Sequence, residues 1–378
     1  MRRCIVRKEA GKTVRVSSPT RKAELIMKIE ELLRLMVEKG ASDLHLRVPS
    51  PPVFRMDGVL LPQEDMEKVS PQFMREMLED ITTETQRERF YTELELDMPF
   101  SIAGLARFRV NAFFQRGTIS LAIRQVPLKI PTIDELALPA VCKTLAIKHK
   151  GLVLVTGATG MGKSTTLASM IDHLNHTERR NVITIEDPIE FLHQNQKCII
   201  AQRDLGADTK SFAEALKHAL RQDPDVILVG EMRDLETMAT AITAAETGHL
   251  VLSTLHTSST TQTIDRIVDV FPAYQQPQIR FQLSMVLEGV LSQVLLPRAG
   301  GKGRVAVFEV MVATDAIRNI IRDGRTEQMP TYLQTGRQVG MQTMDQALID
   351  VVKTGAVALE EAAMRANKPD EVRRLLRT

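Results

Sequence analysis

The stretch that decides the fold runs from Leu152 to Ile171 and reads LVLVTGATGMGKSTTLASMI. Its first part, Leu152–Thr156, is a short apolar run typical of a buried strand, and Thr165–Ile171 has the composition of a helix. Between them, Gly157–Ser164 fits the pattern G-x-x-x-x-G-K-[ST] without a mismatch. Loops of this kind wrap phosphates with backbone N–H groups at a helix N-terminus, so the sequence predicts ATP or GTP binding.

The residues of this loop have separate expected roles. Lys163 is expected to reach the β- and γ-phosphates, and the hydroxyl of Ser164 to hold Mg²⁺. A chance glycine turn is disfavoured because the motif and both flanking elements agree. The expected nucleotide contacts from the loop and the first helical turn are Gly157, Thr159, Gly160, Gly162, Lys163, Ser164 and Thr165.

Three further short apolar runs follow at helix-length intervals: Val182–Ile185, Val226–Val229 and Leu250–Thr254. Runs of this kind predict a parallel sheet covered by helices on both faces. We therefore expect an α/β nucleotide-binding domain at 150–378, preceded by a linker and domain start at 127–149. Its tail, from about Phe271 onward, is predicted to be mostly helical.

Carboxylates follow two of these predicted strands. Glu186, Asp187 and Glu190 come after the second run, and Glu231 comes after the third. Hydrolysis requires one carboxylate that positions water and another in the metal shell, at the C-terminal ends of neighbouring strands. An acidic residue at a strand end is also a common solvated edge or helix N-cap, so both interpretations stay open.

His256 follows the fourth run directly. A histidine at the tip of a sheet strand is placed either to sense the γ-phosphate by hydrogen bonding or to serve as a packing residue, and the sequence does not separate the two. A metal site with His249 is disfavoured, because no third ligand lies nearby and alternate side chains of a strand point apart.

The N-terminal part of the chain predicts a different structure. Residues 1–23 carry eight Lys or Arg and no apolar period, which indicates a flexible leader. Apolar residues then recur at helical spacing from Glu24 until Gly40. Alternation over Arg107–Phe114, a turn, and the run Ile119–Arg124 predict a hairpin with arginines on one face. Residues 24–126 are therefore expected to form a small α+β domain.

Composition excludes several classes of protein. The 378 residues carry a net charge of +2, 43% hydrophobic residues and no Trp, which is typical of an ordinary soluble protein and gives no basic field for nucleic acid. No apolar run is long enough to span a membrane, so we expect a cytoplasmic location. The three cysteines, Cys4, Cys142 and Cys198, exclude a zinc ribbon and a disulfide scaffold and are expected to be buried thiols.

Four stretches taken together resemble the secretion-superfamily ATPases. Gly157–Ser164, Ile183–Phe191, Leu220–Asp234 and Gly248–Thr257 match that family's Walker A, Asp box, Walker B and His box in order. Within the superfamily, three more stretches resemble the type IV pilus retraction ATPases: Gly40–Leu46, Ala316–Asp323 and Gly340–Gln346. The resemblance covers residues 24–378.

The resemblance implies a RecA-like ATPase domain after a smaller α+β (PAS-like) N-terminal domain. It makes Glu190 and Glu231 the main catalytic carboxylates, with Glu186 beside them and His256 in the His box; Glu231 would also bind Mg²⁺ through water. It further implies a homohexamer at the inner face of the cytoplasmic membrane, acting on an inner-membrane pilus platform protein. The phosphates would be reached by three arginines of the N-terminal domain: Arg107, Arg109 and Arg124.

The sequence departs from the family pattern at two loop positions, and it leaves several other functions open. Ala158 and Met161 replace the usual Pro and Ser of the loop, with little effect expected because these positions contribute mainly backbone. Arg318 and Arg322 are four residues apart on one predicted helix and are expected to project together. The spacing alone favours a solvated flank, whereas the resemblance implies a role in communicating with the pilus base. The rivals are a pilus-extension or type II secretion ATPase, an accessory retraction paralogue, a RecA-like nucleic-acid motor and a non-catalytic nucleotide-binding scaffold.

Overall fold

The computed structural model describes residues 21–56, 58–127, 129–301 and 303–376, with side chains from Ile29 onward. The chain divides into two compact units on either side of the Val126–Pro127 bond. The first helix, α1 (Arg21–Glu38), begins inside the stretch expected to be a leader, because Arg21 and Lys22 are themselves good helix formers. The rest of that expected leader, residues 1–20, lies outside the described residues.

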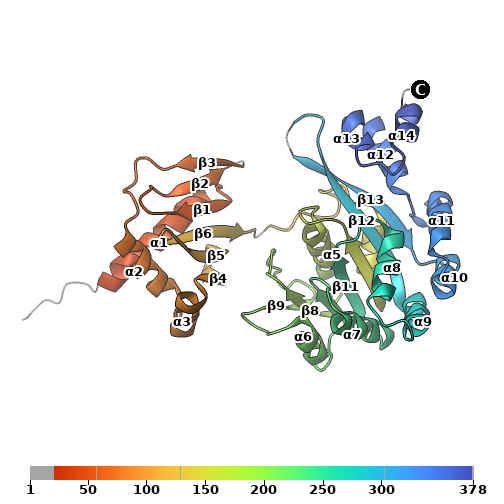
Figure 1. Ribbon diagram of the computed structural model, residues 1–378, viewed down its shortest axis with the longest axis horizontal. Coiled ribbons are helices and arrows are strands. Elements are labelled where there is room, and N and C mark those ends of the chain that lie inside the picture. The colour runs from red at the N-terminus through yellow and green to blue at the C-terminus, as the bar shows by residue number, and fades with distance from the viewer. Residues whose placement is uncertain (1–20, 57, 128, 302, 377–378) are drawn as a thin grey trace, which may run out of the picture. The chain divides into compact units, whose positions relative to one another are not determined.

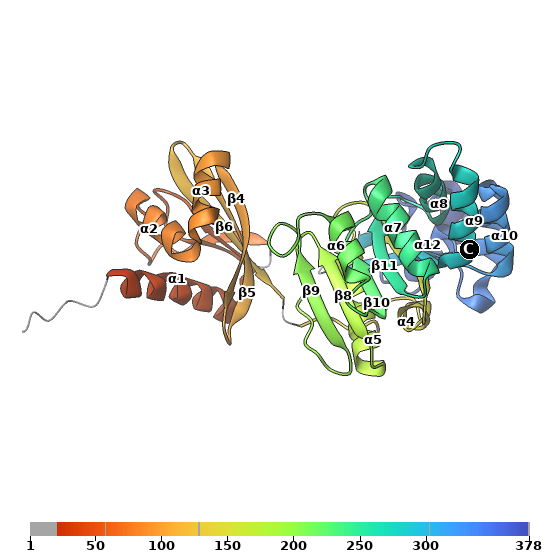
Figure 2. The same ribbon diagram turned by 90° about the horizontal axis from the view of Figure 1, so that it is seen from below.

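The N-terminal unit is an antiparallel sheet in the order β3-β2-β1-β6-β5-β4, with helices packed on one face (Figures 1 and 2). Its helices are α1, α2 (Pro71–Ile81) and α3 (Glu84–Glu93). Its strands are β1 (Asp43–Leu46), β2 (Val53–Met56), β3 (Val59–Pro62), β4 (Glu95–Ile102), β5 (Ala106–Gln115) and β6 (Thr118–Val126). This arrangement confirms the expected α+β fold.

The predicted hairpin is present as β5 and β6, which pair antiparallel from Gln115 opposite Thr118 to Arg107 opposite Val126. Phe108 and Val110 of β5 are buried against the helices. Arg107 and Arg109 alternate with these two residues and therefore lie on the other face of the sheet, because successive side chains of a strand point to opposite faces. The period-two prediction is confirmed.

The C-terminal unit is built on a seven-stranded sheet in the order β13-β12-β7-β11-β10-β8-β9 (Figure 1). Neighbouring strands are parallel except for β13, which pairs antiparallel with β12. The strands are β7 (Gly151–Thr156), β8 (Asn181–Glu186), β9 (Ile199–Asp204), β10 (Val226–Val229), β11 (Leu250–Leu255), β12 (Leu287–Pro297) and β13 (Arg304–Val312). The four predicted strands are confirmed as β7, β8, β10 and β11.

Alternate residues of these strands enter two cores, one on each face of the sheet. One face packs against α4 and α5, and the other against α6–α10 (Figure 2). The helices are α4 (Val141–Ala146), α5 (Lys163–Thr177), α6 (Phe212–Ala219), α7 (Leu235–Glu246), α8 (Thr260–Asp269), α9 (Gln276–Val286), α10 (Asp315–Asp323), α11 (Met329–Thr335), α12 (Met344–Lys353), α13 (Leu359–Ala363) and α14 (Pro369–Leu376).

Two features of the tail differ from expectation. The long strands β12 and β13 interrupt the region predicted to be mostly helical. The helix α10 is present, but its Arg318 does not project outward: the guanidinium donates to Ser284 O (2.9 Å) and Met285 O (3.0 Å) and pairs with Glu288 (2.8 Å). Arg322 lies over the ring of Phe281 in α9. Both arginines thus lie on the side of α10 that faces α9, so they share a face as predicted, but Arg318 is bonded to α9 and Glu288.

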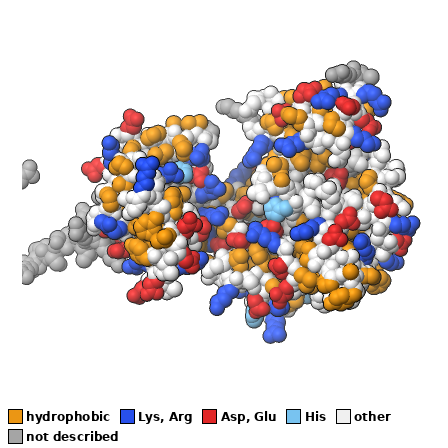
Figure 3. Space-filling view, viewed as in Figure 1, with side chains coloured by type: hydrophobic (Ala, Val, Ile, Leu, Met, Phe, Trp, Pro, Cys, Tyr) orange, Lys and Arg blue, Asp and Glu red, His pale blue; other side chains and the backbone are white. Residues whose placement is uncertain are grey.

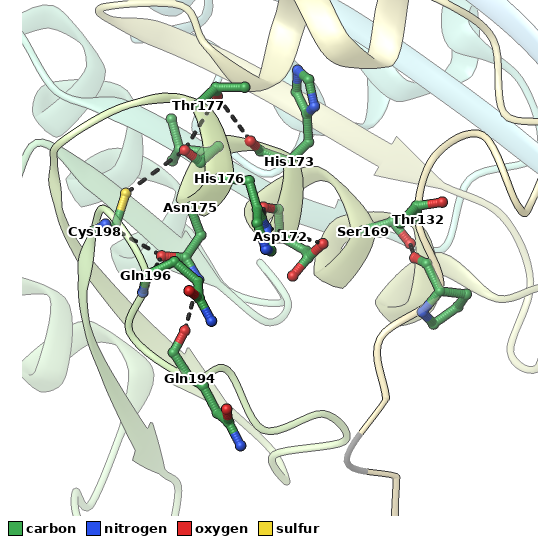
Figure 4. Close-up of polar contacts among 12 residues, drawn as sticks. Thr132, Ser169, Asp172, His173, Asn175, His176, Thr177, Gln194, Gln196 and Cys198 are labelled. Atoms are coloured by element: carbon green, nitrogen blue, oxygen red, sulfur yellow. Dashed lines mark hydrogen bonds and ion pairs between the residues drawn. The ribbon is translucent and has the colours of Figure 1, made fainter.

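Hydrogen bonds to flanking loops hold helix α5 near its middle and near its C-terminal end (Figure 4). Near its middle, the Ser169 hydroxyl donates to Pro131 O (2.6 Å). Near its end, the buried Asn175 donates to Gln194 O (2.7 Å) and accepts from the backbone N–H groups of Gln196 (3.0 Å) and Cys198 (3.2 Å). These contacts fix the helix that carries the phosphate loop.

The expected buried thiols are found at Cys142 and Cys198, while Cys4 lies outside the described residues. Burial raises the pKa of Cys142 to about 12, which makes that thiol unreactive. On the face shown in Figure 3, acidic and basic side chains are interspersed. In the described part of the chain, none of the helices combines the length and the apolar character needed to cross a membrane.

Candidate nucleotide-binding and catalytic site

The phosphate loop joins the end of β7 to the start of α5. Gly162 is the residue before the helix and has a φ of 81°, and Gly157 opens the loop at 142°; both values lie in the region that favours glycine. The first helical backbone bond runs from Thr166 N to Gly162 O. The amides of the turn before Thr166 therefore have no intrahelical acceptor, as an anion site at a helix N-terminus requires.

Lys163 lies at the centre of this loop. Its Nζ donates to Gly157 O (2.8 Å) and Ala158 O (3.2 Å), and the residue is 8% exposed. Burial lowers the pKa of Lys163, while the negative charges of Glu231 and Glu190 act in the opposite direction. The ammonium therefore belongs to the same electrostatic site as both predicted carboxylates.

Around the lysine, the other predicted contacts differ in exposure. Thr159 and Gly160 lie exposed at the tip of the loop, and Ser164 and Thr165 are half-buried in the first turn of α5. Ser164 is the second residue of α5, so its hydroxyl lies at the N-terminal end of the helix, where an anion is stabilised. The loop thus combines backbone donors, a cation and hydroxyl oxygens within eight residues.

Glu231 forms the second part of the site. Its carboxylate accepts from Arg233 Nη2 (2.8 Å) and contacts His256 Nε2 (3.0 Å), and the side chain is largely buried. Burial raises the pKa of Glu231, but the hydrogen bond from Arg233 and the charges of Arg233 and His256 outweigh it, and the net shift is downward. Glu231 is therefore held as a carboxylate beside His256, which joins the Walker B and His box stretches.

Strand β11 sets the position of Glu231. The Ser253 hydroxyl donates to Val229 O (2.7 Å), and the Thr254 hydroxyl donates to Gly230 O (2.6 Å). Both carbonyls precede Glu231 directly, and Met232 N returns a bond to Thr254 O (3.2 Å). The turn that carries the carboxylate is thus bonded on both sides to the strand that carries His256.

The two glutamates of the Asp box differ in their surroundings. Glu186 is half-buried, and its Oε1 accepts from the Thr184 hydroxyl (2.6 Å) and from Gln202 Nε2 (3.1 Å). Burial raises the pKa of Glu186, although these hydrogen bonds oppose the shift. Glu190 is exposed four residues further on. Of the two, Glu190 has the accessible carboxylate, and Glu186 is bonded into the loop that carries it.

The three predicted arginines belong to the N-terminal unit. Arg124 pairs with the buried Asp43 (2.7 Å), and Arg109 lies 3.9 Å from the exposed Asp97. Arg109 is directly opposite Arg124 across the β5–β6 pair, with Arg107 two residues before it on the same face. The arginines therefore form one basic group on the outer face of their own sheet.

Two residues at the site were not among the predicted contacts. Arg233 lies within the quoted Walker B stretch, so its spacing from Glu231 was a signal in the sequence. Gln293 of β12 had no such signal: its amide contacts Met161 and Thr166, which lie more than 120 residues earlier in the chain. Met161 also accepts from Leu295 N through its sulfur atom (3.3 Å), a side-chain contact beyond the backbone role expected for this position.

The parallel sheet and the phosphate loop with strand-end carboxylates define the class of P-loop NTPases with a RecA-like core. Residues 19–364 match the family described as type II/IV secretion system protein, and the chain belongs to that family.

Among its relatives is the type IV pilus retraction ATPase PilT of Pseudomonas aeruginosa, with 49% identity over 91% of this chain and 99% of that protein. The type IV pilus ATPase PilU of the same organism is 42% identical over 93% of this chain and 92% of that protein. A crystal structure of the pilus retraction motor PilT with bound ADP superposes with a TM-score of 0.86, at 46% identity, covering 92% of this chain and 99% of that chain.

Proposed function

We propose that this chain is a Mg-ATP-hydrolysing hexameric motor that powers type IV pilus retraction and twitching motility. The observation that carries the ATPase part is the convergence of Lys163 with the Glu231–His256 pair at one end of the parallel sheet. The retraction part rests on the relationship to PilT, which extends over nearly the whole of both chains. Extension and secretion ATPases are less favoured for that reason.

The residues of the site divide the work of phosphoryl transfer. The Lys163 ammonium exchanges its bonds to the Gly157 and Ala158 carbonyls for the β- and γ-phosphate oxygens. Glu190, exposed on the Asp-box loop, orients the attacking water as the principal general base. His256 contacts the γ-phosphate while its Nε2 stays within reach of Glu231.

Oxygen donors for Mg²⁺ are present at the site. The Ser164 hydroxyl is at the first turn of α5, and Glu231 is kept ionised by Arg233. This hard-oxygen set suits magnesium, with Ser164 as a direct ligand and Glu231 acting through a bound water. When bound, the ion neutralises negative charge on the phosphates.

A ring and a membrane partner complete the proposed motor. Arg107, Arg109 and Arg124 act on the phosphates of a nucleotide within a homohexamer. The ring works in the cytoplasm at the inner face of the cytoplasmic membrane, where it contacts the pilus platform protein. Deleting the gene is expected to leave pili that do not retract and cells that do not twitch.

Phosphate release and nucleotide binding test the ATPase assignment together. Lys163→Ala removes the only full positive charge of the loop and is expected to abolish turnover in a folded protein. Glu231→Gln and Glu190→Gln are expected to bind ATP and lose hydrolysis. Wild-type turnover in Lys163→Ala would overturn the assignment of this loop as the active site, and normal turnover in both glutamate variants would move the catalytic base elsewhere.

A further inference from the structure

Strand β12 packs directly against the phosphate loop, a contact that the sequence did not predict. A Cβ atom placed on Gly157 would lie 2.4 Å from the Gln293 carbonyl oxygen, and one on Gly162 would lie 3.0 Å from Gln293 Nε2. The first and the sixth residue of the loop therefore both touch one residue of β12. This contact is possible only because both loop positions are glycine.

The side-chain amide of Gln293 then joins the loop to the helix that follows it. Its Nε2 donates to Met161 O (2.7 Å), and its Oε1 accepts from the Thr166 hydroxyl (2.7 Å). Gln293 is 2% exposed and Thr166 is 1% exposed, so water does not compete for these bonds. The donor and the acceptor of one planar amide are thus both used, on either side of Lys163.

We infer that Gln293 is a positioning residue for nucleotide binding, which holds the loop amides of residues 161–163 against the first turn of α5. This inference rests on the proposed function, because it concerns the same loop. Phosphate affinity depends on several backbone N–H groups pointing at one anion. An amide that fixes the Met161 carbonyl also fixes the peptide plane that carries the Gly162 N–H, since both belong to one planar unit.

The alternative is that Gln293 only stabilises the fold. A fold-only role predicts that its loss lowers the unfolding temperature of the nucleotide-free protein and leaves nucleotide affinity intact. A positioning role predicts weaker binding of ADP, which needs no turnover, in protein that remains folded. The dissociation constant of ADP therefore separates the two roles. The unfolding temperature of the nucleotide-free protein measures the contribution of Gln293 to the fold.

The test is a titration of full-length protein with fluorescent ADP. Gln293→Leu removes both hydrogen bonds and is expected to weaken ADP binding about tenfold, as the loss of one or two buried hydrogen bonds implies. Thr166→Val removes one bond at nearly constant volume and is expected to weaken ADP binding by a smaller factor. Thr166→Ser keeps the hydroxyl and is expected to restore wild-type affinity.

Ser292→Ala is the matched control. Ser292 is the neighbouring buried residue of β12, and its hydroxyl has no hydrogen-bond partner among the described residues. Wild-type affinity in Gln293→Leu would overturn the inference. If Gln293→Leu does not fold, equal affinity in Thr166→Val and wild type overturns it instead. A wild-type protein that binds no ADP would contradict the proposed function itself, which distinguishes the two failures.

Discussion

The pKa of Glu186 is shifted in the opposite direction to that of Glu231: burial raises the pKa of both carboxyls, but the side-chain donors to Glu186 are uncharged and the negative charge of Asp204 also acts on it. Thr184 and Gln202 donate to one of its oxygens, whereas Glu231 has an arginine and a histidine beside it. Neutral donors offset only part of the cost of burying a charge. The pKa of Glu186 is accordingly raised and that of Glu231 lowered. These opposite shifts suggest a positioning role for Glu186 in the Asp-box loop.

The substitution Glu186→Gln is expected to raise the unfolding temperature at pH 7. A carboxyl whose pKa is higher in the folded than in the unfolded protein destabilises the fold once it is ionised. That penalty is complete above the folded pKa and disappears below the unfolded value of about 4.5. The gain from glutamine is therefore expected to shrink as the pH falls from 7 to 4, as measured by thermal unfolding.

Glu190→Gln is the control for this experiment, because it makes the same chemical change at an exposed position four residues after Glu186. It is expected to leave the unfolding temperature unchanged over the same pH range. If Glu186→Gln abolishes hydrolysis without the pH-dependent gain in stability, Glu186 is a catalytic group and the positioning role is wrong.

At the residue scale, sequence reasoning found what is local in the chain. The phosphate loop is contiguous, so Lys163 and its glycines were predictable from spacing alone. Glu231 was predictable because it follows an apolar run. Gln293 was not, because its partners at Met161 and Thr166 are brought to it only when β12 pairs with β7.

At the element scale, β12 shows why a strand can escape prediction. Its apolar residues Leu287, Val290, Leu291, Val294 and Leu295 fall at the spacing of one helix face. Helix α9 also ends at Val286, directly before the strand, so no turn signal separates them. Burial on both sides of the sheet removes the alternation that identifies a half-exposed strand. Strand β9 was missed for another reason, since it is an edge strand with only one buried residue, Asp204.

Arg318 of α10 supports a prediction about stability. Its guanidinium bonds two carbonyls at the C-terminal end of α9 and pairs with Glu288, and its side chain is only 20% exposed. Arg318→Ala leaves the two carbonyls without this donor, while Glu288 keeps its ion pair with Lys148 (2.9 Å). The substitution is expected to cost about 2 kcal/mol in urea unfolding. Arg322→Ala removes only an exposed contact with the Phe281 ring and is expected to cost less than about 1 kcal/mol.

Motility measurements on the same two variants distinguish a role at the pilus base from a structural role of Arg318. A helix that contacts the pilus base through Arg318 would lose twitching in the Arg318→Ala variant with its stability and ATPase rate unchanged. The contacts with α9 predict instead that motility, ATPase rate and stability fall together. Arg322→Ala is the control, because it changes an arginine of the same helix and is expected to leave the stability nearly unchanged.

At the scale of the whole molecule, the arginines of the N-terminal sheet are not equivalent. Asp43 is buried, and the hydrogen bonds from Arg124 and Ser42 outweigh the effect of burial and lower its pKa. Removing Arg124 would leave that carboxylate without its nearest cation. Arg109 has only a 3.9 Å contact with the exposed Asp97. Arg109 is therefore the arginine whose loss tests phosphate contact with the least damage to the fold.

Mixed rings test whether the site is shared between subunits. Co-expressed Lys163→Ala and Arg109→Ala chains are expected to regain ATPase activity that neither has alone, because a neighbour supplies the missing arginine. Random mixing in a head-to-tail ring gives about a quarter of sites with both groups intact. The measurement is phosphate release by the purified mixed assembly, with its mass from light scattering. A mixture no more active than its separate components, or a monomer at high concentration with ATP, would contradict the shared site.

The contact between Gly157 and the Gln293 carbonyl has a consequence for recombining this chain with its relatives. Any side chain at position 157 requires β12 to move, and β12 is paired with β7 from Leu287 to Ser292 and with β13 from Gly289 to Pro297. The loop and the strand are therefore packed too tightly to change independently, although about 130 residues of sequence lie between them. A chimaera that takes residues 157–164 from another protein therefore keeps this packing only if that loop has glycine at position 157.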